Sequence, residues 1–173
     1  MRHEFDLHGL NAERGKVEPL LKEQLGEVLI GAKYFVDDKI LFWGQHFDGH
    51  DFATYSNGYK KGGSIRYREG FVRIPSHVII PVYETKEFEA SKPPRALIEI
   101  PKIVVCKAID LLEEELLVDG FNSHQEMVDG MRKYPGYGQL DPEKMLSFYY
   151  FGRVEWSPTK NQLKSFFERR NQS

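Results

Sequence analysis

The chain has 173 residues, of which 40% are hydrophobic, so it is long enough to bury one sizeable core. No window approaches the roughly 18 consecutive apolar residues of a membrane helix, and the charged N-terminus lacks the apolar segment of a signal peptide. The formal net charge of −2 gives no support for nucleic-acid binding driven by overall charge. We therefore expect a cytoplasmic protein without membrane contact, and its oligomeric state stays open.

The N-terminal half is predicted to begin with a helix and to continue with short strands. Leucine and valine recur at helical spacing within residues 13–30. β-branched and aromatic residues at 40–43 predict a short buried strand, and further strands are predicted at 64–67 and 77–83. The residues between 44 and 63 are rich in Gly, Asp, His and Asn, so we expect a loop there.

A longer strand is predicted at residues 96–107, with an interruption at Pro101 that is typical of a strand bending around a corner. Cys106 is the only cysteine, so no intrachain disulfide can form, and its apolar neighbours predict a buried thiol.

Two short helices follow, at 110–119 and 123–133, and each is expected to begin with a capping box. The first box pairs Asp110 with Glu113, and the second pairs Ser123 with Glu126. A strand at 145–154 and a helical tail from residue 159 complete the prediction.

Strands and helices do not alternate regularly in this order, which favours an α+β fold over a parallel α/β sheet. We divide the chain into an N-terminal helical extension (1–39), one central domain (40–156) and a C-terminal helical tail (157–173).

Charge is unevenly distributed along the central domain. Residues 57–73 contain five lysines and arginines against one acid, whereas residues 110–119 contain five acids and no base. The pattern predicts a basic loop that faces an acidic segment across a cleft, and two separately solvated faces are the alternative.

Three stretches of the central domain resemble the ASCH family, a branch of the PUA-like superfamily. AIDLLEEELLVDGFNSHQE (108–126) resembles the family signature around an Asp-Gly-Phe turn, GGSIRYR (62–68) resembles its Gly-x-Lys motif with a closing Arg, and FYYF (148–151) resembles its last strand. The resemblance covers about residues 40–156. It implies a PUA-like mixed β-barrel with short flanking helices and a cleft for RNA or a modified nucleoside.

Some small bacterial members of the family remove the acetyl group from N4-acetylcytidine with a Lys, a Thr, an Arg and an acid. By position, the Arg matches Arg68 and the acid matches Asp119, whereas the Lys falls on Gly63 and the Thr on Arg66. Arg66 carries no nucleophilic oxygen. We therefore expect no useful hydrolysis of N4-acetylcytidine.

Our first expectation is a non-enzymatic module for RNA or a nucleotide-like ligand, in which Lys60, Lys61 and Arg68 contact phosphate while Arg66 and Tyr59 flank a base. An ion pair between Arg68 and an acid is the structural alternative for that arginine.

Two other functions stay open. One is an amidohydrolase acting on an acylated nucleoside, with Ser64 as nucleophile, Lys61 as its activator and Asp119 as proton shuttle. The other is a protein-interaction module that uses the helical ends. His46 and His50 are metal-ligand types, but no further ligand cluster is visible, so no metal ion and no cofactor are expected.

Overall fold

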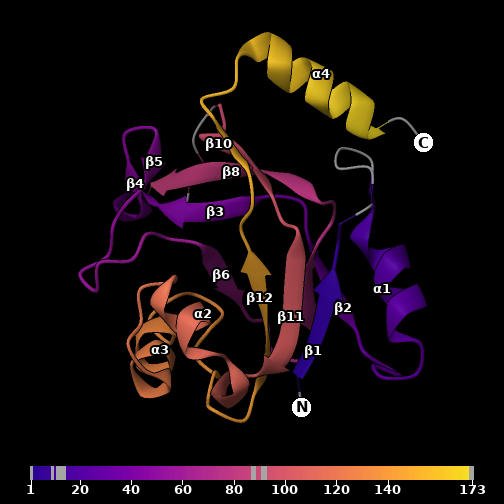
Figure 1. Ribbon diagram of the computed structural model, residues 1–173, viewed down its shortest axis with the longest axis vertical. Helices are drawn as coiled ribbons and strands as arrows, with labels where there is room; N and C mark the ends of the chain where they lie inside the picture. Colours follow the sequence, from indigo (N-terminus) through magenta and orange to yellow (C-terminus); the bar gives the residue numbers. More distant parts are fainter. Residues whose placement is uncertain (1, 9, 11–14, 87–88, 91–92, 172–173) are drawn as a thin grey trace.

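The computed structural model describes residues 2–8, 10, 15–86, 89–90 and 93–171. The chain is a mixed α+β protein, as expected, with two larger sheets and two separate strand pairs (Figure 1). Within the described residues none of these sheets closes into a barrel, so a PUA-like barrel is not confirmed.

The first sheet is antiparallel and has four strands. In sheet order these are β1 (Arg2–Asp6), β11 (Lys102–Lys107), β12 (Met145–Tyr150) and β6 (Gly63–Arg66). Successive side chains of a strand point to opposite faces. Accordingly, Tyr149 enters one core of the protein while its neighbour Phe148 enters another.

The second sheet combines antiparallel and parallel pairing. Its order is β13 (Val154–Trp156), β10 (Ala96–Glu99), β8 (Ile79–Lys86) and β3 (Ile40–Trp43), with β9 (Glu89–Ala90) also paired to β8. The predicted strand at 96–107 is therefore two strands in different sheets, divided at Pro101. The two smaller pairs are β2 (Tyr34–Asp37) with β7 (Val72–Pro75), and β4 (Phe47–Asp48) with β5 (Asp51–Phe52).

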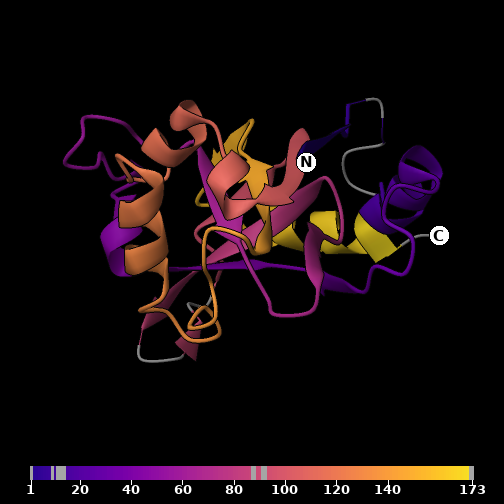
Figure 2. The same cartoon turned by 90° about the horizontal axis from the view of Figure 1, so that it is seen from below.

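The described residues form four α-helices around the sheets: α1 (Val17–Leu25), α2 (Glu113–Leu117), α3 (His124–Met131) and α4 (Lys160–Asn171). Figure 2 shows α1 and α3 at opposite ends of the molecule. Leu163 and Phe166 of α4 pack on Leu97 of β10, so the tail is a helix with its apolar side covered, as predicted. Within the described part of the chain, no helix is long and apolar enough to cross a membrane.

Residues 1–39, predicted to form a helical extension, contribute β1 and β2 as well as α1. The helix is shorter than the predicted 13–30, and residues 13 and 14 lie outside the described residues. Its buried side chains, Val17, Leu21 and Leu25, recur every four residues and join the largest core cluster of the protein. The N-terminal residues thus share a core with the central domain.

One of the two predicted capping boxes is wrong. Residues 108–110 form a short 3-10 turn, so α2 begins later, and the carboxylate of Glu115 accepts a hydrogen bond from the backbone N–H of Leu112 at 2.8 Å. The second box is confirmed in its N-cap half, because the hydroxyl of Ser123 accepts from the backbone N–H of Glu126 at 3.1 Å.

Candidate functional site

A cavity of about 280 Å³ lies between the inner strands and the segment around α3. In Figure 1, β6 runs between β3 and the α2–α3 pair. Residues of β3, β6 and α3 line the cavity, together with Asp119 and Phe121, which follow α2. Its lining is mainly aromatic and cationic, with one acid: Leu41, Phe42, Trp43, His46, Lys61, Ser64, Ile65, Arg66, Arg73, Thr85, Asp119, Phe121, Met131, Tyr134, Pro135 and Tyr137. A concave site that combines aromatic walls with charged and hydrogen-bonding side chains can hold a small molecule.

The wall of this cavity contains a buried ion pair between Lys61 and Asp119. The side chains are 3% and 6% exposed, respectively. Asp119 uses its second oxygen, Oδ2, to accept a hydrogen bond from the backbone N–H of Ile65 at 3.1 Å. The carboxylate is thereby fixed between the lysine and strand β6, which compensates much of the cost of burying two charges.

Backbone contacts explain why these two residues meet. The N–H of Gly62 donates to the carbonyl of Val118 at 2.9 Å, which joins the start of β6 to the end of α2. Gly63 follows in β6, and a Cβ at that position would lie 2.2 Å from Cζ of Phe148. The glycine pair therefore permits close packing of this segment against Val118 and Phe148.

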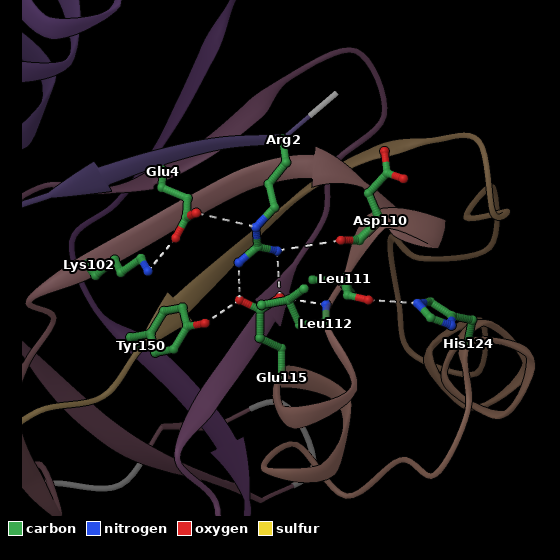
Figure 3. A network of polar contacts seen from close by, with 9 residues as sticks. All are labelled: Arg2, Glu4, Lys102, Asp110, Leu111, Leu112, Glu115, His124 and Tyr150. Atoms are coloured by element: carbon green, nitrogen blue, oxygen red, sulfur yellow. Dashed lines mark hydrogen bonds and ion pairs between the residues drawn. The ribbon is translucent and has the colours of Figure 1, made fainter.

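Figure 3 shows how the start of α2 is held in place. Both nitrogens of the Arg2 fork donate to the fully buried carboxylate of Glu115, at 2.7 and 2.6 Å. Tyr150 donates to the same carboxylate. Burial opposes ionisation of Glu115, but the hydrogen bonds from Arg2, Tyr150 and the Leu112 backbone outweigh it and lower its pKa. Strand β1 thus anchors the helix that precedes Asp119.

The environment of Lys61 makes its side-chain amine a weaker base than usual. Burial lowers the pKa of Lys61, and Asp119 only partly opposes that effect. Nζ lies 4.5 Å from the ring centroid of Phe42 and donates to the hydroxyl of Tyr55 at 3.3 Å. A lysine of this kind suits proton transfer better than a surface lysine does.

His46 completes a short polar chain with Tyr55. Its Nδ1 lies 3.2 Å from the Tyr55 hydroxyl. Burial, together with the charges of Lys61 and Arg66, lowers the pKa of His46 to about 3. The imidazole is therefore neutral at physiological pH and adds no charge to the cavity.

Ser64 and Arg66 line the same cavity from one face of β6, as their spacing of two residues predicts. Ser64 is 3% exposed. Arg66 places its guanidinium 5.2 Å from the ring centroid of Phe42. Within the described residues, its Nε and Nη2 atoms are buried and have no hydrogen-bond partner.

The other predicted binding residues lie outside this cavity. Lys60 and Tyr59 are exposed, and Lys60 forms an ion pair with Asp51 at the surface. Arg68 is also exposed, and its guanidinium lies 4.3 Å from the ring centroid of Phe35. Lys61, which was grouped with Lys60 as a phosphate contact, is instead buried and paired.

Several cavity residues were not singled out from the sequence: Trp43, Thr85, Tyr134 and Tyr137. The last two lie in the segment that follows α3, on either side of Pro135-Gly136. Phe121, which belongs to the Asp-Gly-Phe turn, is half-buried and lines the cavity.

Two further observations complete the site. The described residues contain no group of three or more His, Cys, Asp or Glu side chains arranged to hold a metal ion. Comparisons with protein-family models, curated proteins and solved structures find no match to this chain.

Proposed function

We propose that the chain is an ASCH-type, PUA-like module that binds a nucleoside-like small molecule in the cavity beside Lys61, Ser64, Arg66 and Asp119. The observation that carries the proposal is that these four polar residues, taken from β6 and from the end of α2, meet inside one aromatic-walled cavity. Its volume of about 280 Å³ suits a single nucleoside and not a length of RNA.

The lining suits the two kinds of contact that a base makes, which are stacking and hydrogen bonding. Aromatic side chains offer surfaces on which a base stacks, and such stacking contributes about 1–3 kcal/mol for each base. Phe42 and Tyr134 are among the rings around the cavity. Lys61 and Arg66 supply donors for the carbonyl and ring-nitrogen acceptors of a base.

The exposed basic residues lend less support to a strand of RNA along the surface. Lys60 already faces Asp51, and Arg68 stacks on Phe35 and Phe71. The protein-interaction alternative predicts a cavity filled by side chains, and the open cavity argues against it.

Calorimetric titration with single nucleosides tests the proposal. Binding should be measurable with the wild-type protein, and Tyr134→Ala should weaken it roughly tenfold through lost stacking. Tyr59→Ala is the matched control, because that ring is 45% exposed and lies outside the cavity. The reverse pattern, with Tyr59→Ala weakening binding and Tyr134→Ala leaving it unchanged, would place the ligand on the surface loop.

Hydrolysis of an acylated nucleoside is a second candidate, and one observation favours it. The motif alignment placed the family lysine on Gly63 and the threonine on Arg66, which argued against hydrolysis, yet Lys61 and Ser64 line the cavity together with Asp119. The three residues required by this alternative therefore share one cavity. The hydrogen bonds of Lys61 go to Asp119 and Tyr55, so the candidate rests on the shared cavity and not on a contact between Lys61 and Ser64.

The corresponding reaction would begin when Oγ of Ser64 attacks the acyl carbon of the amide. The Lys61–Asp119 pair would take the hydroxyl proton and pass it to the departing amine, and water would then hydrolyse the acyl-serine. Release of cytidine from N4-acetylcytidine tests this candidate. Turnover that disappears in Ser64→Ala and persists in Ser147→Ala, a buried serine of β12 outside the cavity, would support it. Absence of turnover in the wild-type protein would exclude this substrate.

A further inference from the structure

Among the described residues, Arg66 lacks the carboxylate partner that three other largely buried cations have. Arg2, Lys61 and Arg73 are each paired with a carboxylate: Glu115, Asp119 and Asp37, respectively. Arg66 has no such partner among the described residues, although its Nε and Nη2 atoms are shielded from solvent. A buried donor without an acceptor is destabilising, so each such group requires an explanation.

The two unpartnered atoms form one edge of the guanidinium. The N–H bonds of Nε and Nη2 on that edge are parallel, so they match two acceptor atoms that lie side by side in one plane. Among the described residues these two nitrogens have no hydrogen-bond partner, and the guanidinium lies 5.2 Å from the ring centroid of Phe42. Because no hydrogen bond fixes this edge, a rotation of the side chain would turn it toward the cavity that Arg66 lines, and the inference requires that rotation.

Thr85 gives a second, independent indication at the same cavity. Its hydroxyl is also buried and has no partner among the described residues, and it enters from β8, across from β6. Unsatisfied polar groups from two different sheets thus border one cavity. The other buried side-chain atoms without a partner among the described residues, Nε2 of His77 and Oγ of Ser147, lie outside this cavity. At the cavity, a polar ligand can supply the missing partners.

We propose that Arg66 is the specificity-determining residue of the site and selects a base with two adjacent acceptors. Among the common bases, guanine offers such an edge at O6 and N7, and cytosine offers one at O2 and N3. Adenine and uracil place a donor beside the acceptor, so one Arg66 N–H stays unmatched. This inference rests on the proposed binding of a nucleoside-like ligand.

Ligand variants test the inference with the unaltered protein. Guanosine and cytidine should bind on the order of tenfold tighter than adenosine and uridine in calorimetric titrations. Replacing N7 of guanosine by a C–H group, in 7-deazaguanosine, removes one acceptor without altering the shape of the base. That change should lower the affinity by a similar factor. Equal affinity for guanosine and its 7-deaza analogue, together with equal affinity for cytidine and uridine, would overturn the inference.

Protein variants then assign the preference to Arg66. Arg66→Met removes the donors and should abolish the difference between guanosine and 7-deazaguanosine, and Arg66→Lys should also abolish it because an ammonium lacks the paired edge. Arg68→Met is the matched control, since Arg68 is exposed and outside the cavity, and it should keep the difference. A preference that survives both Arg66 changes would contradict the assignment.

The two proposals fail in different ways. If all four nucleosides bind equally, the selectivity of Arg66 is wrong while nucleoside binding stands. If none of the four binds at millimolar concentration, nucleoside binding itself fails, and the role of Arg66 fails with it.

Discussion

Lys61 and Asp119 form an ion pair in the wall of the cavity, although they are 58 positions apart in the chain. The pair joins the start of β6 to the end of α2, and each partner also contacts a second group of the site. Lys61 donates to Tyr55, and Asp119 accepts from the backbone of Ile65. The pair therefore holds the two segments together at the cavity wall, and each partner balances the buried charge of the other.

Removing one member of this pair should destabilise the protein strongly. Lys61→Met leaves the carboxylate of Asp119 buried without its cation, a change that typically costs about 3–5 kcal/mol. Urea unfolding gives the free energy directly. The neighbouring Lys60→Met is the matched control, because the pair with Asp51 is exposed to solvent and should contribute little to stability. Equal losses for both variants would show that Lys61 is solvated.

The neutral state of His46 predicts a dependence of stability on pH. Its pKa of about 3 lies far below the ordinary value of 6.5, so between these values the unfolded chain binds more protons than the folded one. Stability should then fall as the pH decreases below about 6.5, by at most about 1.4 kcal/mol per pH unit from this residue.

His46→Gln should reduce this slope in unfolding experiments between pH 6.5 and 4. Part of the slope should persist, because burial and the charges of Arg170 and Lys16 also lower the pKa of His77, to about 4. Identical pH profiles for the wild-type protein and His46→Gln would disprove the neutral, desolvated state of His46.

The contacts of Arg2 with Glu115 predict that the N-terminal strand stabilises the whole fold. Arg2→Met removes two hydrogen bonds from a carboxylate with no exposed surface and should cost about 3–5 kcal/mol at pH 7. Lys102→Met, which breaks the more exposed pair with Glu4, should cost less than about 1 kcal/mol.

Acid should remove the contribution of this network. The pKa of Glu115 is lowered in the folded protein, so its stabilisation is fully present above the ordinary value of 4.5 and is lost as the pH falls through the folded value. The difference between the wild-type protein and Arg2→Met should therefore shrink in acid unfolding experiments. A difference that stays constant to low pH would contradict an ionised Glu115.

Close packing at Gly63 gives a further prediction. In Gly63→Ala the new methyl group would lie 2.2 Å from Cζ of Phe148 and 2.8 Å from the carbonyl oxygen of Tyr149, so strand β6 must shift. We expect a loss of at least about 1–3 kcal/mol in thermal unfolding. Gly138→Ala, where no atom lies within 4 Å of the added Cβ, should change stability by less than about 0.5 kcal/mol. A neutral Gly63→Ala would show that β6 and β12 are not packed so closely.

Local patterns predicted many elements but missed those that depend on distant partners. The strand at 40–43, the break at Pro101 and the Ser123 cap follow from residues that are neighbours in sequence. Strand β1 has no such signal, because its polar side chains alternate with few apolar ones and its partner β11 lies about 100 residues away in the chain.

The same reason explains what was wrong about the basic segment. Lys60 and Lys61 have equivalent local sequence contexts, yet one is exposed and the other pairs inside the protein. Their difference arises from the carboxylates that the fold places beside them, Asp51 and Asp119. Sequence reasoning grouped Ser64, Lys61 and Asp119 through a family resemblance, and the structure places all three at the cavity.

The central claim, that the cavity holds the ligand, is tested most directly by the methionine methyl signals. Met131 lines the cavity, whereas Met127 and Met145 do not. In a protein labelled with ¹³C at the methionine methyl groups, titration with guanosine or cytidine should shift the Met131 signal and leave that of Met145 in place. Saturable binding with no shift of the Met131 signal would contradict the account, because the ligand would then lie elsewhere on the protein.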